Sequence, residues 1–155
     1  MSLTRLTADV PGGTDLLLDS SALIAYFGSE PTTPIVAHIV DDWIASGRNF
    51  GVVSPVTAME LSVRPWTAGV AAVTSVIDFL STFPNVRVIE LDRDGGLLAG
   101  KLRADLNLSA ADALIVATGA RASVRHVVTN DGMWAARLPG LGFAVVALKD
   151  FLPFP

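Results

Sequence analysis

DLLLDSSALIAYF, residues 15–27, is the stretch that decides the fold class. Leucines 16–18 form a short, uninterrupted apolar run, which is typical of a strand buried on both faces. Asp19 follows directly, and the residues after it predict a helix that begins near Ser20. Because ligands of open α/β sheets bind outside the carboxyl ends of the strands, we expect Asp19 to lie at a ligand-binding edge.

The same alternation of strand and helix continues along the chain. Short apolar runs predict further strands at 50–53, 86–91, 126–129 and 143–148. Between them the patterns predict helices at 34–46, 55–64, 68–83, 92–106 and 109–122. Pro65 is expected to end the helix at 55–64. Strands that alternate with helices in this way indicate a parallel sheet covered on both faces, and thus an α/β fold.

A chain of 155 residues predicts a single domain. We expect a flexible leader at 1–14, the domain at 15–150 and an apolar tail at 151–155. The longest uncharged stretch, roughly 67–77, is shorter than the 18 or more residues that span a membrane, so no membrane association is predicted. No cysteine is present, which excludes disulfides, zinc–thiolate sites and cysteine nucleophiles and fits a reducing cytoplasm.

The composition points to a partner. Hydrophobic residues make up 51% of the chain and charged residues only 17%, so some apolar surface is expected to be covered by a second copy or another protein. Trp66, expected in a loop after Pro65, and the apolar tail are the candidate contacts. The net charge of −4 excludes a broad basic surface, so any contact with nucleic acid must come from local arginines.

Four acids, Asp19, Glu60, Asp112 and Asp131, are the candidate site residues. Two would leave strand ends and two would lie in early turns of helices that follow strands, and these places meet at one edge of a parallel sheet. Like charges held together repel by about 4 kcal/mol for a pair at 4 Å and an effective dielectric of 20. Such a cluster holds either a proton or a hard metal ion, which predicts metal-assisted cleavage of a phosphodiester.

Each acid also has a simpler interpretation. Asp19 can cap the following helix, and Asp112 forms a capping-box pattern with Ser109. Asp131 suits the turn Asn130-Asp131-Gly132, whose Asn130 can also support a water molecule on a metal ion together with Thr129.

Glu60 follows Val56 by four residues and is expected along a buried stripe of Val56, Met59 and Val63. Its simpler interpretation places it at the edge of that stripe with its carboxylate in water.

Other chemistries lack their motifs. No G-x-S-x-G elbow, phosphate-binding loop or dinucleotide-binding glycine pattern is present. A receiver-like signalling domain would require a pair of acids after the first strand, where Ser20 and Ser21 stand instead.

The chain resembles the PIN-domain nucleases, and among them the VapC-like toxins of toxin–antitoxin pairs. The resemblance rests on LLLDSSALIAYF (16–27), SPVTAMEL (54–61), LSAADALIVATGAR (108–121) and HVVTNDGMW (126–134). It implies a three-layer α/β/α sandwich with a central, mainly parallel sheet and a ribonuclease that depends on Mg²⁺ or Mn²⁺. It also implies a homodimer that is silenced by a small antitoxin.

The resemblance further implies that the four acids form the catalytic set. Ser21 would support the first acid and Thr129 would lie beside the last. We expect Asp19 and Asp112 to hold the metal directly, with Glu60 and Asp131 acting directly or through water.

The chain departs from the family in its long leader and in Trp134, where the family often has Phe. The competing interpretation is a catalytically silent PIN-like module that binds RNA or protein. The basic residues that are candidates for RNA contact are Lys101, Arg103, Arg121 and Arg125.

Overall fold

The computed structural model describes residues 3–152, and five parallel strands form its central sheet. The strands are β1 (Asp15–Leu18), β2 (Phe50–Val53), β3 (Val86–Val88), β4 (His126–Thr129) and β5 (Ala144–Ala147). Their order across the sheet is β3-β2-β1-β4-β5, so β1 lies in the middle, where Leu17 is in register with Val52 and with Val127. The predicted parallel sheet is confirmed.

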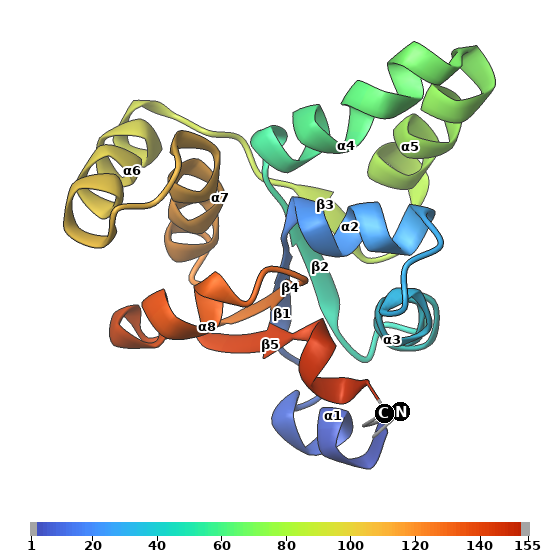
Figure 1. Cartoon of the computed structure of the whole chain (residues 1–155), viewed down its shortest axis with the longest axis horizontal. Helices are drawn as coiled ribbons and strands as arrows, with labels where there is room; N and C mark the ends of the chain where they lie inside the picture. The colour runs from blue at the N-terminus through green and yellow to red at the C-terminus, as the bar shows by residue number, and fades with distance from the viewer. Residues whose placement is uncertain (1–2, 153–155) are drawn as a thin grey trace.

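Helices cover both faces of this sheet (Figure 1). One side carries α2 (Ser20–Phe27), α3 (Thr33–Ala37), the π-helix η1 (His38–Ile44), α4 (Pro55–Ala68) and α5 (Val70–Thr82). The other carries α6 (Arg93–Leu106), α7 (Ala110–Arg121), α8 (Met133–Arg137) and the 3-10 turn η2 (Pro139–Leu141). The architecture is the expected three-layer α/β/α sandwich.

The alternation of side chains along β1 divides the core into two clusters. Leu16 and Leu18 pack into the cluster under α2, α3 and η1, whereas Leu17 packs into the cluster under α6 and α7. Helix α7 lies very close to the sheet, because a Cβ added at Gly119 would be 2.7 Å from Leu17 Cδ2. This close packing fixes the position of α7, whose first turn carries Asp112.

Helix α4 differs from the prediction. It continues through Pro65 to Ala68 and ends at Gly69, which has φ +124°. Proline removes only its own N–H from the helix, and the Pro65 carbonyl still accepts a hydrogen bond from the Gly69 N–H at 3.0 Å. Trp66 therefore lies on a helix and not in a loop, and its side chain is 63% exposed.

Strand β3 and the helix predicted over 34–46 also differ from their predicted bounds. β3 ends at Val88 and not at residue 91, and the segment predicted as one helix over 34–46 is divided into α3 and η1. Trp134, at the position where the sequence departs from the family, is fully packed into the core below α7.

The sequence predicts a flexible leader over 1–14, and the structure shows that residues 3–9 of it have regular structure. They form helix α1 (Leu3–Asp9), in which Leu6 is completely buried. Arg5 lies over the ring of Phe151 at 5.3 Å, so α1 contacts the turn η3 (Leu148–Phe151). Phe151 is thus buried within its own chain, whereas residues 153–155 of the predicted tail lie outside the described residues. Within residues 3–152, no helix combines the length and the apolar character that a membrane crossing requires.

Candidate active site

Asp19 is buried at the carboxyl end of the central strand, with only 3% of its surface exposed. It occupies the N-cap position of α2, but its side chain makes no capping hydrogen bond there. Its carboxylate instead accepts hydrogen bonds from Ser21 Oγ at 2.5 Å and from Thr129 Oγ1 at 2.8 Å. The capping interpretation therefore does not account for this side chain.

The electrostatics of Asp19 are unfavourable to its negative charge. Burial raises the pKa of the Asp19 carboxyl above its ordinary value, the hydroxyls of Ser21 and Thr129 oppose that rise, and the charge of Asp112 adds to it. The ion pairs within residues 3–152 involve other acids and leave Asp19 with no cationic neighbour. A buried carboxylate in this condition is stabilised by a proton or by a bound cation.

The turn after β4 is fastened around Asp19 by its backbone. The Asn130 N–H donates to Ser21 Oγ at 2.9 Å, and the Asp131 N–H donates to Thr129 Oγ1 at 3.0 Å. Both hydroxyls thus receive a hydrogen bond from the turn and donate one to the Asp19 carboxylate. The sequence placed Ser21, Thr129 and Asn130 beside the acids, and the structure brings all three into this network.

Asp112 lies in the first turn of α7 and is half-buried. Ser109 Oγ accepts a hydrogen bond from the Asp112 N–H at 3.0 Å, as the capping pattern predicted. The charge of its carboxylate still acts on Asp19, so capping and a site role are compatible in this residue.

Asp131 and Glu60 are less closely tied to Asp19. One Asp131 oxygen accepts the N–H of Met133 at 2.8 Å, which is the turn interaction expected from the sequence. Glu60 is half-buried on α4, but the predicted stripe is wrong, because Met59 and Val63 are 53% and 54% exposed. The buried residues of α4 are Thr57 and Leu61, so its packed face is rotated from the one expected.

The four acids do not form a ready-made metal cage. Within residues 3–152, no three His, Asp or Glu side chains are close enough together to hold one ion jointly. Asp112 is the acid whose charge raises the pKa of Asp19, while Asp131 accepts a hydrogen bond in its own turn. The carboxylate and hydroxyl oxygens around Asp19 are nevertheless the donors that Mg²⁺ and Mn²⁺ prefer, and they lack a competing cation. The residues present therefore fit a hard divalent ion held by few protein ligands.

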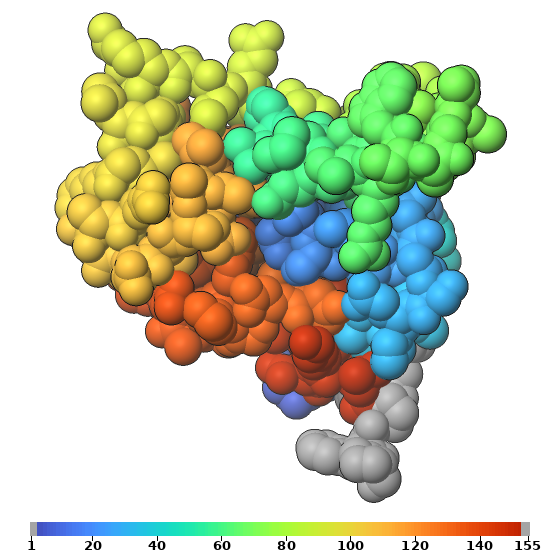
Figure 2. Space-filling model, turned by 45° about the horizontal axis from the view of Figure 1, so that its top comes forward, coloured from blue at the N-terminus to red at the C-terminus, as the bar shows by residue number. Residues whose placement is uncertain are grey.

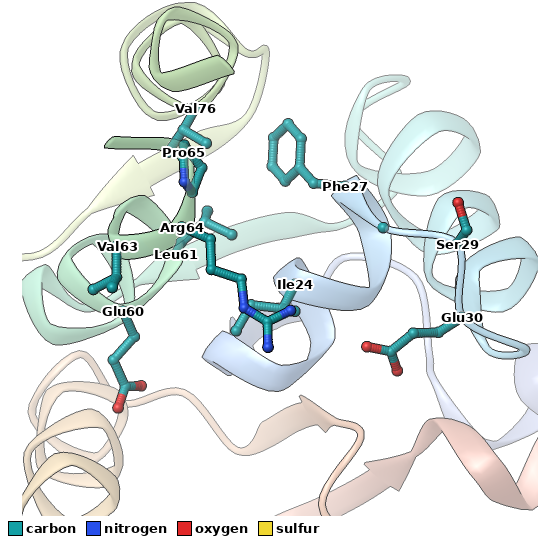
Figure 3. Close-up of a pocket in the computed structure, with 11 residues that line it drawn as sticks. Ile24, Phe27, Ser29, Glu30, Glu60, Leu61, Val63, Arg64, Pro65 and Val76 are labelled. Atoms are coloured by element: carbon teal, nitrogen blue, oxygen red, sulfur yellow. The ribbon is translucent and has the colours of Figure 1, made fainter. Parts of the chain in front are cut away.

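An apolar groove of about 620 Å³ lies between α2, α4 and α5, next to Glu60. Figure 3 shows Arg64 extending into it from α4, with Glu60 on one side and Glu30 on the other. Its apolar wall consists of Ile24, Phe27, Leu61, Val63, Pro65 and Val76. In Figure 2 the α4–α5 segment rises beside α2 and overhangs it.

Sequence reasoning missed Arg64 and Glu30. Arg64 was detectable, because it follows Glu60 by four residues on the same helix and must share its face. Glu30 had no signal, since it lies in the connection between α2 and α3 and belongs to none of the acidic motifs.

An α/β/α sandwich with acids at the carboxyl edge of its sheet can be compared with known protein families. The model of the PIN domain matches residues 16–139, which is well over half of the chain. The chain belongs to the PIN domain family, a family of nucleases. Comparison with the sequences of curated proteins gave no match.

Solved structures of VapC toxins share this fold. VapC20 of Mycobacterium tuberculosis, a toxin that cleaves the sarcin–ricin loop, is 18% identical, with a TM-score of 0.66 over 86% of this chain and 98% of that one. A toxin–antitoxin complex from Klebsiella pneumoniae gives 20% identity and a TM-score of 0.66 over 87% and 98%. VapBC2 of Rickettsia felis, bound to a DNA fragment from its promoter, gives 16% and 0.64 over 86% and 98%.

Proposed function

We propose that this protein is a metal-dependent endoribonuclease that acts in the cytoplasm as the toxin of a toxin–antitoxin pair. One observation carries the proposal: a buried carboxylate, Asp19, lies at the carboxyl end of the central strand without a counter-charge and within the field of Asp112. Membership of a nuclease family and the likeness to VapC toxins support it.

Asp19 and Asp112 are the residues that would hold Mg²⁺ or Mn²⁺, and Glu60 and Asp131 would assist directly or through water. A divalent ion at such a site supplies positive charge to the phosphate and makes a water molecule more acidic. Ser21 and Thr129 hold the Asp19 carboxylate in one orientation, because each donates a hydrogen bond to it. Burial of Asp19 keeps bulk water from screening its charge.

Arg64 is the basic residue best placed to contact an RNA phosphate, because it extends into the groove beside Glu60 (Figure 3). Two of the basic residues suggested by the sequence form ion pairs on helix surfaces: Lys101 pairs with Asp105, and Arg121 pairs with Asp92. We therefore take Arg64, which lines the groove, as the proposed electrostatic contact with substrate.

We assign the groove to a small antitoxin and the exposed α4–α5 surface to a second copy of the chain. The groove is mainly apolar, and two of the similar structures are toxin–antitoxin complexes. Trp66 and Val70 are 63% and 78% exposed, which is unusual for large apolar side chains unless a partner covers them.

Light scattering at micromolar concentration should give the mass of a dimer, and Trp66→Ala should shift the mass toward that of the monomer. A monomeric wild type would contradict the assignment of the α4–α5 surface to a second copy.

The nuclease proposal is tested by Asp19→Asn and Asp112→Asn. Each substitution removes a charge with little change of shape, so each should abolish Mn²⁺-dependent cleavage of a fluorescently labelled RNA while circular dichroism stays that of the wild type. Asp150→Asn is the matched control, because Asp150 is exposed in the turn η3, away from the acidic site and from the α4–α5 surface, and should leave cleavage unchanged. Full activity of both site variants would exclude the mechanism.

A silent PIN-like module that binds RNA or protein is the second candidate. It is favoured by one observation, the absence within residues 3–152 of three acids arranged to hold one ion. Calorimetric titration with Mn²⁺ separates the two candidates, because a silent module should neither bind the ion through Asp19 nor cut RNA.

A further inference from the structure

Glu30 is connected to the acidic site by a hydrogen bond that no sequence motif anticipates. Its carboxylate oxygen Oε2 accepts a hydrogen bond from Asn130 Nδ2 at 2.7 Å, across 100 positions of sequence. Asn130 in turn donates its backbone N–H to Ser21, which donates to Asp19. A continuous chain of three hydrogen bonds thus joins the exposed Glu30 to the buried Asp19.

The loop that carries Glu30 is itself held in place. Thr33 Oγ1 accepts the Glu30 N–H at 3.0 Å and donates to the Ala25 carbonyl at 2.6 Å, at the end of α2. Glu30 therefore projects from a fixed support on α2 and α3 toward the turn after β4. Because the site turn begins at Asn130, this support can hold the turn from outside the sheet.

The chemistry of the pair fixes the orientation of the Asn130 amide. An ionised carboxylate only accepts hydrogen bonds, so Asn130 must present its NH₂ group to Glu30 and its carbonyl oxygen the other way. That oxygen, Oδ1, is buried and has no hydrogen-bond partner within the described residues. A buried acceptor without a donor is costly unless a ligand or a water molecule meets it.

We propose, on the basis of the nuclease function above, that Glu30 is a positioning residue of the active site. It orients Asn130 and thereby holds the Asn130–Asp131 turn against Ser21 and Asp19. The buried Asn130 carbonyl oxygen would then be a further oxygen donor for a hydrated cation bound at the site. Glu30 acts only through Asn130 and does not contact the ion.

Four variants test this: Glu30→Ala, Asn130→Ala, the double variant of both, and Glu30→Gln. Loss of an outer partner of a metal site typically weakens metal binding 10- to 100-fold, so Glu30→Ala should bind Mn²⁺ about 10-fold more weakly by calorimetry. Its kcat for RNA cleavage should fall by about the same factor, with little change in KM. Glu30→Gln keeps an acceptor for Asn130 and should restore most of the affinity.

The double variant gives the decisive comparison. If Glu30 acts through Asn130, the double variant should be no worse than Asn130→Ala alone, because both substitutions break the same link. Independent, multiplicative losses, together with a Glu30→Gln variant as defective as Glu30→Ala, would show a direct charge effect and overturn the proposal. Asp150→Ala, which removes an exposed carboxylate of η3 outside the network, is the control.

A measurement that does not depend on activity separates this proposal from the nuclease function. Amide hydrogen exchange in the metal-free protein should be faster at Asn130 and Asp131 in Glu30→Ala than in the wild type. If the wild type neither binds Mn²⁺ nor cuts RNA, the nuclease proposal fails, and with it the active-site role of Glu30. If the wild type is active but exchange is unchanged in Glu30→Ala, only the positioning role is wrong.

Discussion

Asp15 and Asp19 stand at opposite ends of the same strand, and their surroundings differ in kind. Asp15 opens β1 and forms an ion pair with Arg87 of β3. Asp19 follows the end of β1, is buried, and has hydroxyl groups around it but no cation in the part of the chain that the structure describes. Because the two residues share a strand, the difference comes from the edge of the sheet at which each one lies.

At the amino edge of the sheet, a buried polar side chain has several hydrogen-bond partners. Asn49, which is fully buried, donates through Nδ2 to the carbonyls of Pro11 and Thr14 at 2.9 and 3.0 Å. Arg48 donates to Asn49 Oδ1 at 2.7 Å and lies 4.0 Å from the ring centroid of Trp43. These contacts attach the segment after α1 to the sheet, and this edge is built for stability.

The carboxyl edge leaves bonding capacity unused. Among residues 3–152, Asp19 finds no counter-charge and Asn130 Oδ1 finds no donor, although both are buried. Groups of this kind destabilise a folded protein unless a ligand meets them, so they mark the edge where a ligand is expected. The contrast predicts that substitutions at the two edges act on stability with opposite sign.

The largest effect on stability is expected from Asn49→Ala. The substitution leaves the carbonyls of Pro11 and Thr14 without their donor, and it should lower the free energy of unfolding by about 2–3 kcal/mol. Urea denaturation measures this change, and Mn²⁺ affinity should remain that of the wild type. A loss below about 0.5 kcal/mol would break the contrast between the two edges.

Asp19→Asn should increase the stability of the metal-free protein at neutral pH, in contrast to Asn49→Ala. Burial raises the pKa of Asp19, so the folded state holds a proton to higher pH than the unfolded state does. Stability of the wild type therefore falls as pH rises from the ordinary value near 3.8 through the raised pKa. Asparagine carries no charge to bury, and Tm should rise by roughly 2–4 °C, the shift that about 1 kcal/mol produces in a chain of this size.

Thermal scans of both proteins between pH 4 and pH 8 check this expectation. The advantage of Asp19→Asn should grow with pH and should shrink when Mn²⁺ stabilises the wild type. A variant less stable than the wild type at every pH would mean that the hydroxyl groups alone compensate the charge.

The smallest effect belongs to Asp15→Asn, the matched substitution at the other end of β1. The ion pair with Arg87 joins side chains that are 31% and 53% exposed, and such pairs contribute less than about 1 kcal/mol. The variant should therefore be slightly less stable than the wild type at pH 7, with unchanged RNA cleavage. A gain in stability like that of Asp19→Asn would show that the edge of the sheet does not decide the sign.

Local sequence patterns predicted the bounds of an element correctly where one physical cause sets them. The apolar runs predicted β2 and β4 with their observed bounds, and Ser54-Pro55 predicted the start of α4. The end of α4 was missed because the packing of the α4–α5 pair outweighs the one hydrogen bond that Pro65 removes. Helix α1 was not predicted, because its contacts, Leu6 in the core and Arg5 over the ring of Phe151, are with residues distant in sequence.

For the candidate site, the sequence by itself determined which acids follow strands and which hydroxyl groups accompany them. Short-range rules suffice for that, since a strand end and a helix start fix where Asp19 and Asp112 emerge. Only the tertiary structure decided that Asp19 is buried without a cation, that Glu60 borders a groove beside Arg64, and that Glu30 reaches Asn130. Those properties depend on which distant segments meet and on how far water is excluded between them, and no local pattern of residues encodes either.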